Sequence, residues 1–219
     1  MKESRHSHIN EKKWDKWAEV SDGKGFKYEY LRKAQGFVID LADIKENINF
    51  LDIGCGTGWA VGLAAKAAKN TGNFYGIDLS EAMIKKAAEN FKGIENIRFI
   101  KSNSESIPLP DSYFDTIICT NSFHHYLHPD KAISEISRLL SPGGKAYILD
   151  PAADHLIIKI VNLLYKIFDR AHVKIYSSRE FEKLFVKSGL KYCEPKPLNK
   201  YHIVQIGQKH CTTCHDEKL

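Results

Sequence analysis

Three glycines alternate with other residues directly after a short apolar run in residues 49–59, NFLDIGCGTGW. An apolar run that stops at glycines is typical of a buried parallel strand that ends in a tight turn. The following residues, 60–70, carry small apolar side chains at helical spacing. Glycines let the backbone pass close to a ligand, and a helix N-terminus presents unpaired N–H groups to a polar or anionic group. This segment therefore predicts a strand, a glycine turn and a helix that bind a ligand together.

The spacing of these glycines argues against a dinucleotide. Gly54, Gly56 and Gly58 follow the pattern GxGxG. The dinucleotide fingerprint GxGxxG needs its third glycine one position later, where this chain has Trp59. A nicotinamide or flavin dinucleotide is therefore not the expected ligand.

A second candidate binding residue, Asp78, ends the next apolar strand pattern in residues 73–80, NFYGIDLS. At the carboxyl end of a strand in an open parallel sheet, a carboxylate can accept hydrogen bonds from both ribose hydroxyls. The alternative is a turn aspartate that caps the next helix, but Ser80 fits that role better. A glycine turn with a ribose-binding acid predicts a site for adenosine that needs no pyrophosphate.

Four motifs in order resemble the class I S-adenosylmethionine-dependent methyltransferases, in particular the methyltransferase type 11 group that includes the ubiquinone and menaquinone C-methyltransferases. They are LDIGCGTG (51–58), GIDLS (76–80), SIPLPDSYFD (106–115) and RLLSPGGKAYILD (138–150). The resemblance implies an α/β fold with a Rossmann-like, doubly wound seven-stranded sheet, mostly parallel with an antiparallel last strand. It also implies an N-terminal helical cap. The expected cofactor is S-adenosyl-L-methionine, with S-adenosyl-L-homocysteine as the product.

The resemblance also implies roles for single residues. Asp52 would bind the cofactor's ammonium group, Asp78 its ribose, and Leu79 would pack on the adenine face. Asn103 stands where the family has an aspartate that accepts from the adenine amino group, and an amide oxygen can accept the same bond. The expected cofactor-binding residues are Tyr28, Asp52, Gly54, Cys55, Gly56, Gly58, Asp78, Leu79, Asn103, Ser104 and Thr120.

The catalytic residues are less evident, because methyl transfer from a sulfonium is an in-line displacement that needs mainly alignment and exclusion of water. His124 and His125 are candidate general bases, since histidine titrates near neutrality. Alternatively, they only shape the pocket while Asn121, with Thr120, contacts the methionine moiety. Asp150 and Tyr176 are further candidates to face the acceptor.

Composition is that of an ordinary globular protein: 219 residues, 43% hydrophobic and 27% charged, with enough apolar side chains for a full core. The net charge of +5 comes from scattered lysines and arginines, which favours a solvated surface over a nucleic-acid footprint. The charged N-terminal stretch lacks a signal peptide's apolar core, and no apolar run reaches the roughly 20 residues that span a bilayer. The five cysteines form no disulfide framework. We therefore expect a cytoplasmic protein.

The chain divides into a polar, basic arm over residues 1–13, predicted to be disordered, a single methyltransferase domain over residues 14–209, and a tail over residues 210–219. Within the domain we expect the cap at residues 14–45 and an insert or lid, with a helix after the fifth strand, at residues 151–176. This insert is unusually apolar. Three roles are open for it: covering the substrate mouth, lying against lipid, or packing into the core or a dimer contact.

The tail contains HCTTCH, in which Cys211, Cys214 and His215 spell the haem c attachment motif. Haem attachment requires export, and four soft ligands in six residues rarely close one zinc tetrahedron. We therefore favour an exposed tail, and no metal is expected.

These observations predict methyl transfer to a small acceptor, and the apolar insert favours a hydrophobic, lipid-like or quinone-like molecule. Nucleic acid is not an expected partner, peripheral membrane contact is left open, and the chain is expected to be a monomer or homodimer. Two alternatives stay open: a protein that binds S-adenosylmethionine or S-adenosylhomocysteine without transfer, as a regulatory or scaffold subunit, and another nucleoside-using enzyme such as a short dehydrogenase.

Overall fold

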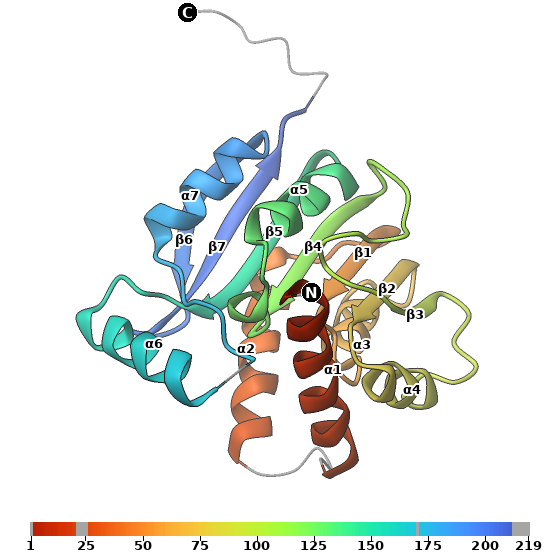
Figure 1. Cartoon of the computed structure of the whole chain (residues 1–219). Helices are drawn as coiled ribbons and strands as arrows, with labels where there is room; N and C mark the ends of the chain where they lie inside the picture. The colour runs from red at the N-terminus through yellow and green to blue at the C-terminus, as the bar shows by residue number, and fades with distance from the viewer. Residues whose placement is uncertain (1, 21–25, 170, 212–219) are drawn as a thin grey trace, which may run out of the picture.

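The structure is a computed structural model of the 219-residue chain, and it describes residues 2–20, 26–169 and 171–211. Within these residues one seven-stranded sheet has the strand order β3-β2-β1-β4-β5-β7-β6 (Figure 1). The strands are β1 (Ile48–Ile53), β2 (Gly72–Asp78), β3 (Ile97–Lys101), β4 (Phe114–Thr120), β5 (Leu140–Pro151), β6 (Leu190–Pro197) and β7 (His202–Lys209). Strands β1 to β5 pair in parallel, whereas β7 runs antiparallel to β5 and β6. The predicted doubly wound sheet with an antiparallel last strand is confirmed.

The described helices follow the expected alternation with the strands. They are α1 (Lys2–Val20), α2 (Phe26–Ala42), α3 (Trp59–Ala67), α4 (Glu81–Asn90), the short 3-10 helix η1 (Phe123–His125), α5 (Pro129–Leu139), α6 (Leu156–Phe168) and α7 (Ser178–Lys187). The strand order reverses between β1 and β4, and the carboxyl ends of strands at such a switch point form the usual ligand crevice of an open α/β sheet.

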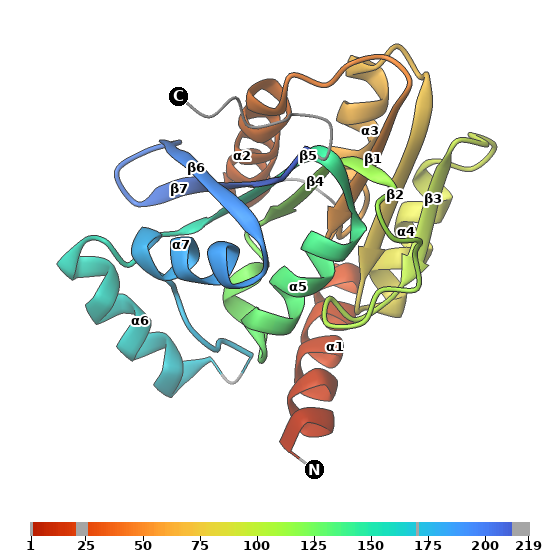
Figure 2. The same cartoon turned by 90° about the horizontal axis from the view of Figure 1, so that it is seen from above.

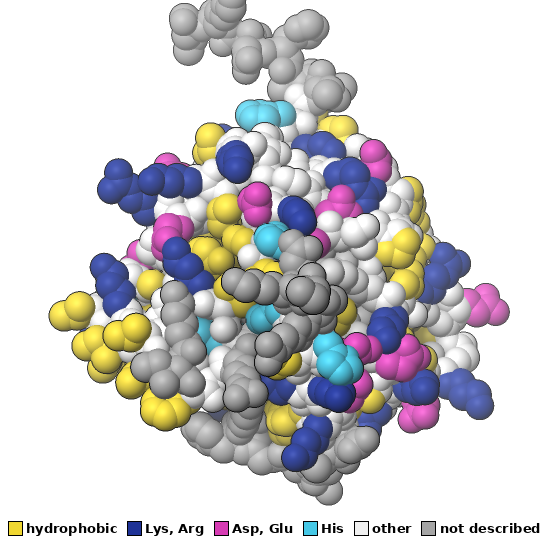
Figure 3. All heavy atoms as spheres, in the orientation of Figure 1, with side chains coloured by type: hydrophobic (Ala, Val, Ile, Leu, Met, Phe, Trp, Pro, Cys, Tyr) yellow, Lys and Arg dark blue, Asp and Glu magenta, His cyan; other side chains and the backbone are white. Residues whose placement is uncertain are grey.

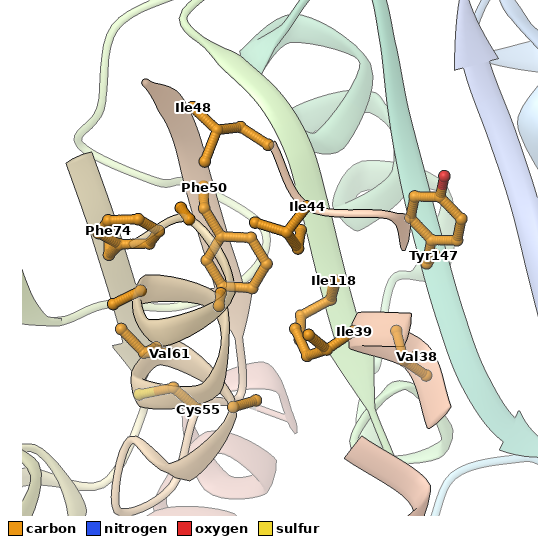
Figure 4. Close-up of a cluster of buried hydrophobic side chains, with 14 of the residues drawn as sticks. Val38, Ile39, Ile44, Ile48, Phe50, Cys55, Val61, Phe74, Ile118 and Tyr147 are labelled. Atoms are coloured by element: carbon orange, nitrogen blue, oxygen red, sulfur yellow. The ribbon is translucent and has the colours of Figure 1, made fainter. Parts of the chain in front are cut away.

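Apolar side chains bury both faces of the sheet. Phe50 of β1 points to one face, where it packs with Phe74 and with Val61 of α3 (Figure 4). Its neighbour Leu51 points to the other face and joins the cluster beneath α5 and α7. Seen from above, α2 and α3 lie on one side of the sheet and α5 and α7 on the other (Figure 2). The three-layer arrangement explains why the strand at residues 48–53 is an apolar run rather than an alternating pattern.

One expectation is wrong: residues 2–13 are not a disordered arm, because they form the first part of α1. This polar helix is held by contacts with distant parts of the chain. His6 and Asn10 reach the backbone carbonyl of His125, at 3.1 and 3.5 Å, and Lys13 pairs with Asp169 at 2.6 Å. Local composition cannot reveal such contacts, since each partner lies more than 100 residues away.

The predicted helix after the fifth strand is α6. No helix among the described residues is long and apolar enough to cross a membrane. Among the described residues, the inner side of α6 anchors the helix. Ile158 packs with Ala153 and Ile175, and the amide oxygen of Asn162 accepts from the backbone N–H of Ile175 at 2.9 Å.

Candidate functional site

A cavity of about 1210 Å³ opens at the carboxyl ends of β1, β2 and β4. Its walls come from α1, α2, the glycine turn after β1, the ends of β2 and β3, the residues after β4, and the segment that follows α6. Helices α1 and α2 both lie at this edge of the sheet in Figure 1, and the ring of Trp17 on α1 stacks on that of Tyr28 on α2. The cavity therefore lies where the fold predicts a nucleoside site, under a helical cover.

The glycine turn is fixed by the neighbouring strand. The N–H groups of Gly54 and Cys55 both donate to the carbonyl of Ile77, at 2.8 and 2.9 Å. Gly54 has φ +80°, and a Cβ built there would lie 2.3 Å from the hydroxyl of Ser122. Only glycine combines this backbone with this close approach. Gly58 also has a positive φ and is the N-cap residue just before α3, but it does not line the cavity.

Asp78 is held in place by two backbone donors. Its carboxylate accepts from the N–H of Gly56 and from the N–H of Ser80, each at 2.9 Å. Burial raises the pKa of Asp78, and these N–H donors oppose the rise. Ser80 caps α4 as expected, accepting from the N–H of Met83 at 3.1 Å. These hydrogen bonds fix the orientation of the Asp78 side chain, which lines the cavity. The carboxylate still has lone pairs that can accept from further donors.

Three buried polar groups around the turn have no hydrogen-bond partner among the described residues: both carboxylate oxygens of Asp52, the amide nitrogen of Asn121 and the hydroxyl of Tyr28. Asp52 is fully buried one residue before the cavity wall, and burial together with the charge of Asp78 raises its pKa to about 8. Unpartnered buried polar groups are rare in native proteins. An acceptor for an ammonium group and two donors for a carboxylate are the set that an α-amino acid needs, so these residues fit the methionine end of S-adenosylmethionine.

The expected adenine residues also line the cavity, namely Leu79, Asn103 and Ser104. The side-chain oxygen of Asn103 already accepts from the N–H of Glu105 at 3.0 Å in an Asx turn. One of its two lone pairs therefore remains for the adenine amino group.

Sequence reasoning missed a cation–aromatic pair at the rim. The guanidinium of Arg32 on α2 lies 4.2 Å from the centre of the Trp59 ring, and both side chains line the cavity. Nothing in the spacing of two residues on separate helices indicates such a pair. Tyr28 is similarly held, since its ring stacks on Trp17 of α1 at 5.0 Å.

The two candidate bases differ sharply in surroundings. The Nδ1 atom of His124 lies 2.8 Å from the carboxylate of Asp150, whereas Nδ1 of His125 lies 2.9 Å from the carbonyl of Ala171. Burial lowers the pKa of His125 to about 2, so this ring stays neutral. Tyr176 packs into the apolar cluster with Phe123 and does not line the cavity, so the expectation that it faces the acceptor is wrong.

The cavity gathers all of the predicted cofactor residues except Asp52 and Gly58, which lie behind its wall. It also includes residues that the sequence did not single out, such as Tyr165, Asp169 and His172 around the end of α6. Of the tail motif, Cys211 is exposed, and Cys214 and His215 lie outside the described residues.

Fold and site together are those of an α/β domain with a glycine turn and an acid, Asp78, at the carboxyl ends of neighbouring parallel strands. A family described as "Methyltransferase domain" matches residues 51–148. Residues 51–148 are therefore similar to the methyltransferase domain of S-adenosylmethionine-dependent methyltransferases, whose methyl donor is this cofactor.

Known proteins show the same relationship. The chain is 32% identical over 168 residues to an uncharacterized methyltransferase, YcgJ, of Bacillus subtilis (strain 168), covering 75% of this chain and 65% of that protein. It is 32% identical over 121 residues to the ubiquinone/menaquinone biosynthesis C-methyltransferase UbiE of Burkholderia cenocepacia (strain HI2424), covering 54% of this chain and 49% of that protein. The crystal structure of a SAM dependent methyltransferase from Aquifex aeolicus shares the fold with a TM-score of 0.67 and 24% identity, covering 82% of this chain and 92% of that one. The chain thus spans between about half and two thirds of these curated relatives.

Proposed function

We propose that this chain transfers the methyl group of S-adenosylmethionine to a small, apolar acceptor. The observation that carries the proposal is the unpartnered set of Asp52, Asn121 and Tyr28 beside the ribose acid Asp78. A buried carboxylate without a partner costs free energy, and a bound ammonium group would remove that cost. A dehydrogenase would bind a nicotinamide dinucleotide, which has no α-amino acid group to pair with Asp52, Asn121 and Tyr28.

The residues of the chain would act mainly by position. Asp52 and Asp78 orient the two ends of the donor, while α1 and α2 cover it and exclude water. The salt bridge between Lys13 and Asp169 ties the cover to the segment after α6. The cofactor supplies an electrophilic methyl group, and the chain supplies its alignment with an acceptor on the His124 side of the cavity. We also propose that residues 14–209 form one methyltransferase domain with a cap at residues 14–45 and a lid at residues 151–176.

The apolar nature of the acceptor is supported by α6. Its outward face is apolar and exposed, with Leu156 74% and Phe168 81% accessible, and it forms the hydrophobic patch at the lower left of Figure 3. Tyr165 and His172 connect this helix to the cavity. The exposed face carries Lys159 and no acidic residue, which suits an anionic lipid surface. A lipid-dissolved acceptor would enter from this side, and the similarity to the ubiquinone/menaquinone biosynthesis C-methyltransferase UbiE agrees with a quinone-like molecule.

A binding protein without transfer activity would use the same cofactor contacts, so binding alone does not separate the two. The separating experiment incubates the protein with methyl-labelled S-adenosylmethionine and either a lipid extract or an aqueous metabolite extract. We expect label in a small organic-soluble product from the lipid extract, and none with Asp78→Ala. Binding without transfer into either extract would favour the scaffold alternative, and label only in aqueous products would contradict the apolar acceptor. Cytoplasmic location and a monomeric or homodimeric state stay predictions.

A further inference from the structure

The side chain of His124 is held by a single buried carboxylate. Asp150, only 2% exposed near the carboxyl end of β5, accepts from the backbone N–H of His124 at 2.7 Å through Oδ2, and its Oδ1 lies 2.8 Å from Nδ1 of the same residue. The backbone carbonyl of His124 in turn accepts from the N–H groups of Val173 and Lys174, at 3.0 and 3.2 Å. Both the main chain and the ring of His124 are therefore fixed.

This geometry decides which ring nitrogen can take up a proton. An ionised carboxylate only accepts hydrogen bonds, so Nδ1 of His124 must carry the hydrogen that it shares with Asp150. Nε2 then has the free lone pair of the neutral ring. The structure gives Nε2 no hydrogen-bond partner among the described residues, and the side chain, 17% exposed, lines the cavity.

His124 is also placed where the reacting groups would meet. It lies three residues after Asn121, whose unpartnered amide belongs to the methionine end of the site. On its other side lies the segment after α6, where the ring of His172 is 5.7 Å away. The ring therefore stands between the donor site and the apolar entrance.

The charged and titratable groups around His124 suit a group that becomes cationic. Asp150 from β5 attracts the imidazolium. The His125 ring, 4.0 Å away, stays neutral because burial lowers its pKa to about 2. His172 after α6 and His202 of β7 are the other titratable neighbours, and burial lowers the pKa of His202 as well.

We propose that His124, positioned by Asp150, is the general base that removes a proton from the acceptor, so that the acceptor is a small apolar molecule with an acidic O–H or C–H, a phenol or an enol. This rests on the proposed function. The proton passes from the acceptor oxygen or carbon to Nε2 of His124. The electron pair left on the acceptor forms the new bond to the methyl carbon as the C–S bond breaks, and that pair goes to sulfur. The positive charge of the sulfonium thus ends on the imidazolium of His124 beside Asp150. The imidazolium then returns its proton to water. A tertiary amine or a thioether has no such proton and needs no base.

The test compares His124→Gln, Asp150→Asn and, as a control, His8→Gln, an exposed histidine on α1. Binding of S-adenosylhomocysteine is measured first and should be the same in all of them. Methyl transfer is then measured with a panel of apolar phenols and enols, and with tertiary amines and thioethers of similar size. We expect transfer to phenols or enols, lowered roughly 10²- to 10⁴-fold by His124→Gln and unchanged by His8→Gln. Asp150→Asn should also lower this transfer, but less than His124→Gln does, because the ring remains and loses only the carboxylate that orients it.

A second readout does not depend on turnover. Nitrogen NMR of histidine-labelled protein with S-adenosylhomocysteine, assigned by the signal lost in His124→Gln, should show the His124 ring with Nδ1 protonated and Nε2 bare. An Nε2-protonated ring, parental rates in His124→Gln, or transfer to no phenol or enol of the panel would overturn the inference. Failure of the parent to bind S-adenosylhomocysteine would instead overturn the proposed function, so the two failures are distinguishable.

Discussion

Asp52 is a buried carboxylate whose surroundings in the empty protein are unfavourable for its charged form. A fully buried carboxylate without a hydrogen-bond partner is poorly solvated, which raises its pKa to about 8. Asp78 is buried as well, but two N–H donors satisfy it. Under the proposed function, Asp78 is a preformed acceptor for the ribose, whereas the partner of Asp52 comes with the ligand.

This difference predicts a pH dependence of the empty protein's stability. Between about pH 4 and about pH 8 the native state holds a proton on Asp52 that the unfolded chain has released. Stability due to this group therefore falls as pH rises through that window, by up to about 1.4 kcal/mol per pH unit. We expect empty Asp52→Asn to be more stable than the parent near pH 8 by at least about 1 kcal/mol, with the difference shrinking towards pH 4. Urea unfolding across this range measures it.

The same variant should bind S-adenosylhomocysteine roughly tenfold or more weakly, because a neutral amide replaces the charged partner of the ammonium group. Asp43→Asn is the matched control, since Asp43 is exposed and pairs only with the exposed Lys45 among the described residues. It should change neither stability nor binding. Parental affinity in Asp52→Asn would show that this carboxylate does not bind the ammonium group.

Gly54 offers a second test at a single position. Gly54→Ala and Gly93→Ala place alanine at φ of +80° and +86°, so both should lose about 1 to 2 kcal/mol from backbone strain. At Gly93 nothing lies within 4 Å, whereas at Gly54 the new methyl meets the Ser122 side chain. We expect a further loss of roughly 1 to 3 kcal/mol in Gly54→Ala, partly restored by adding Ser122→Gly. Equal losses in the two alanine variants, measured by denaturant unfolding, would mean that the turn adjusts freely.

Helix α6 exposes most of its apolar side chains to solvent. Ile158 and Asn162 attach its inner side, while Leu163 and Phe168 face solvent. A soluble helix usually turns its apolar face to the core. The exposed apolar face of α6 is consistent with the proposed lipid-side entrance.

Paired substitutions on the two sides of α6 test this orientation. Leu163→Ser with Phe168→Ser should leave the free energy of unfolding within about 0.5 kcal/mol of the parent, because both side chains are exposed. Ile158→Ala should cost about 2 kcal/mol by emptying the small cluster beneath the helix. The parent should co-sediment with vesicles that contain phosphatidylglycerol, and the double variant should not. Equal sedimentation of the two proteins would exclude this face as a lipid contact.

The sequence revealed elements with strong local signals and missed those held by distant partners. The apolar strands, the cap at Ser80 and the glycine turn follow from local patterns, and the structure contains all of them. The first part of α1, residues 2–13, was missed because its anchors are the carbonyl of His125 and the carboxylate of Asp169. The exposed orientation of α6 could not be foreseen either, since an apolar segment has the same sequence pattern whether it faces the core or the solvent.

For the whole molecule, the strand order explains why residues so far apart in sequence form one site. Asp52, Asp78 and Asn121 end or follow β1, β2 and β4, which are neighbours in the sheet. Parallel pairing sends all three carboxyl ends to the same edge, and α1 and α2 close it. The family motifs could indicate the cofactor residues in advance. The dyad of His124 and Asp150 could not be derived that way, because it depends on how the residues after β4 meet β5.

The most direct test of the account is calorimetric titration of the purified chain with S-adenosylhomocysteine, beside Asp78→Ala. Asp78 would accept from both ribose hydroxyls, and hydrogen bonds to a charged group contribute about 1.5 to 3 kcal/mol each, so the variant should bind about 100-fold more weakly or not measurably. The account predicts one binding site per chain in the parent and this loss in the variant. Absence of binding in the parent, or equal affinity in the two proteins, would contradict it.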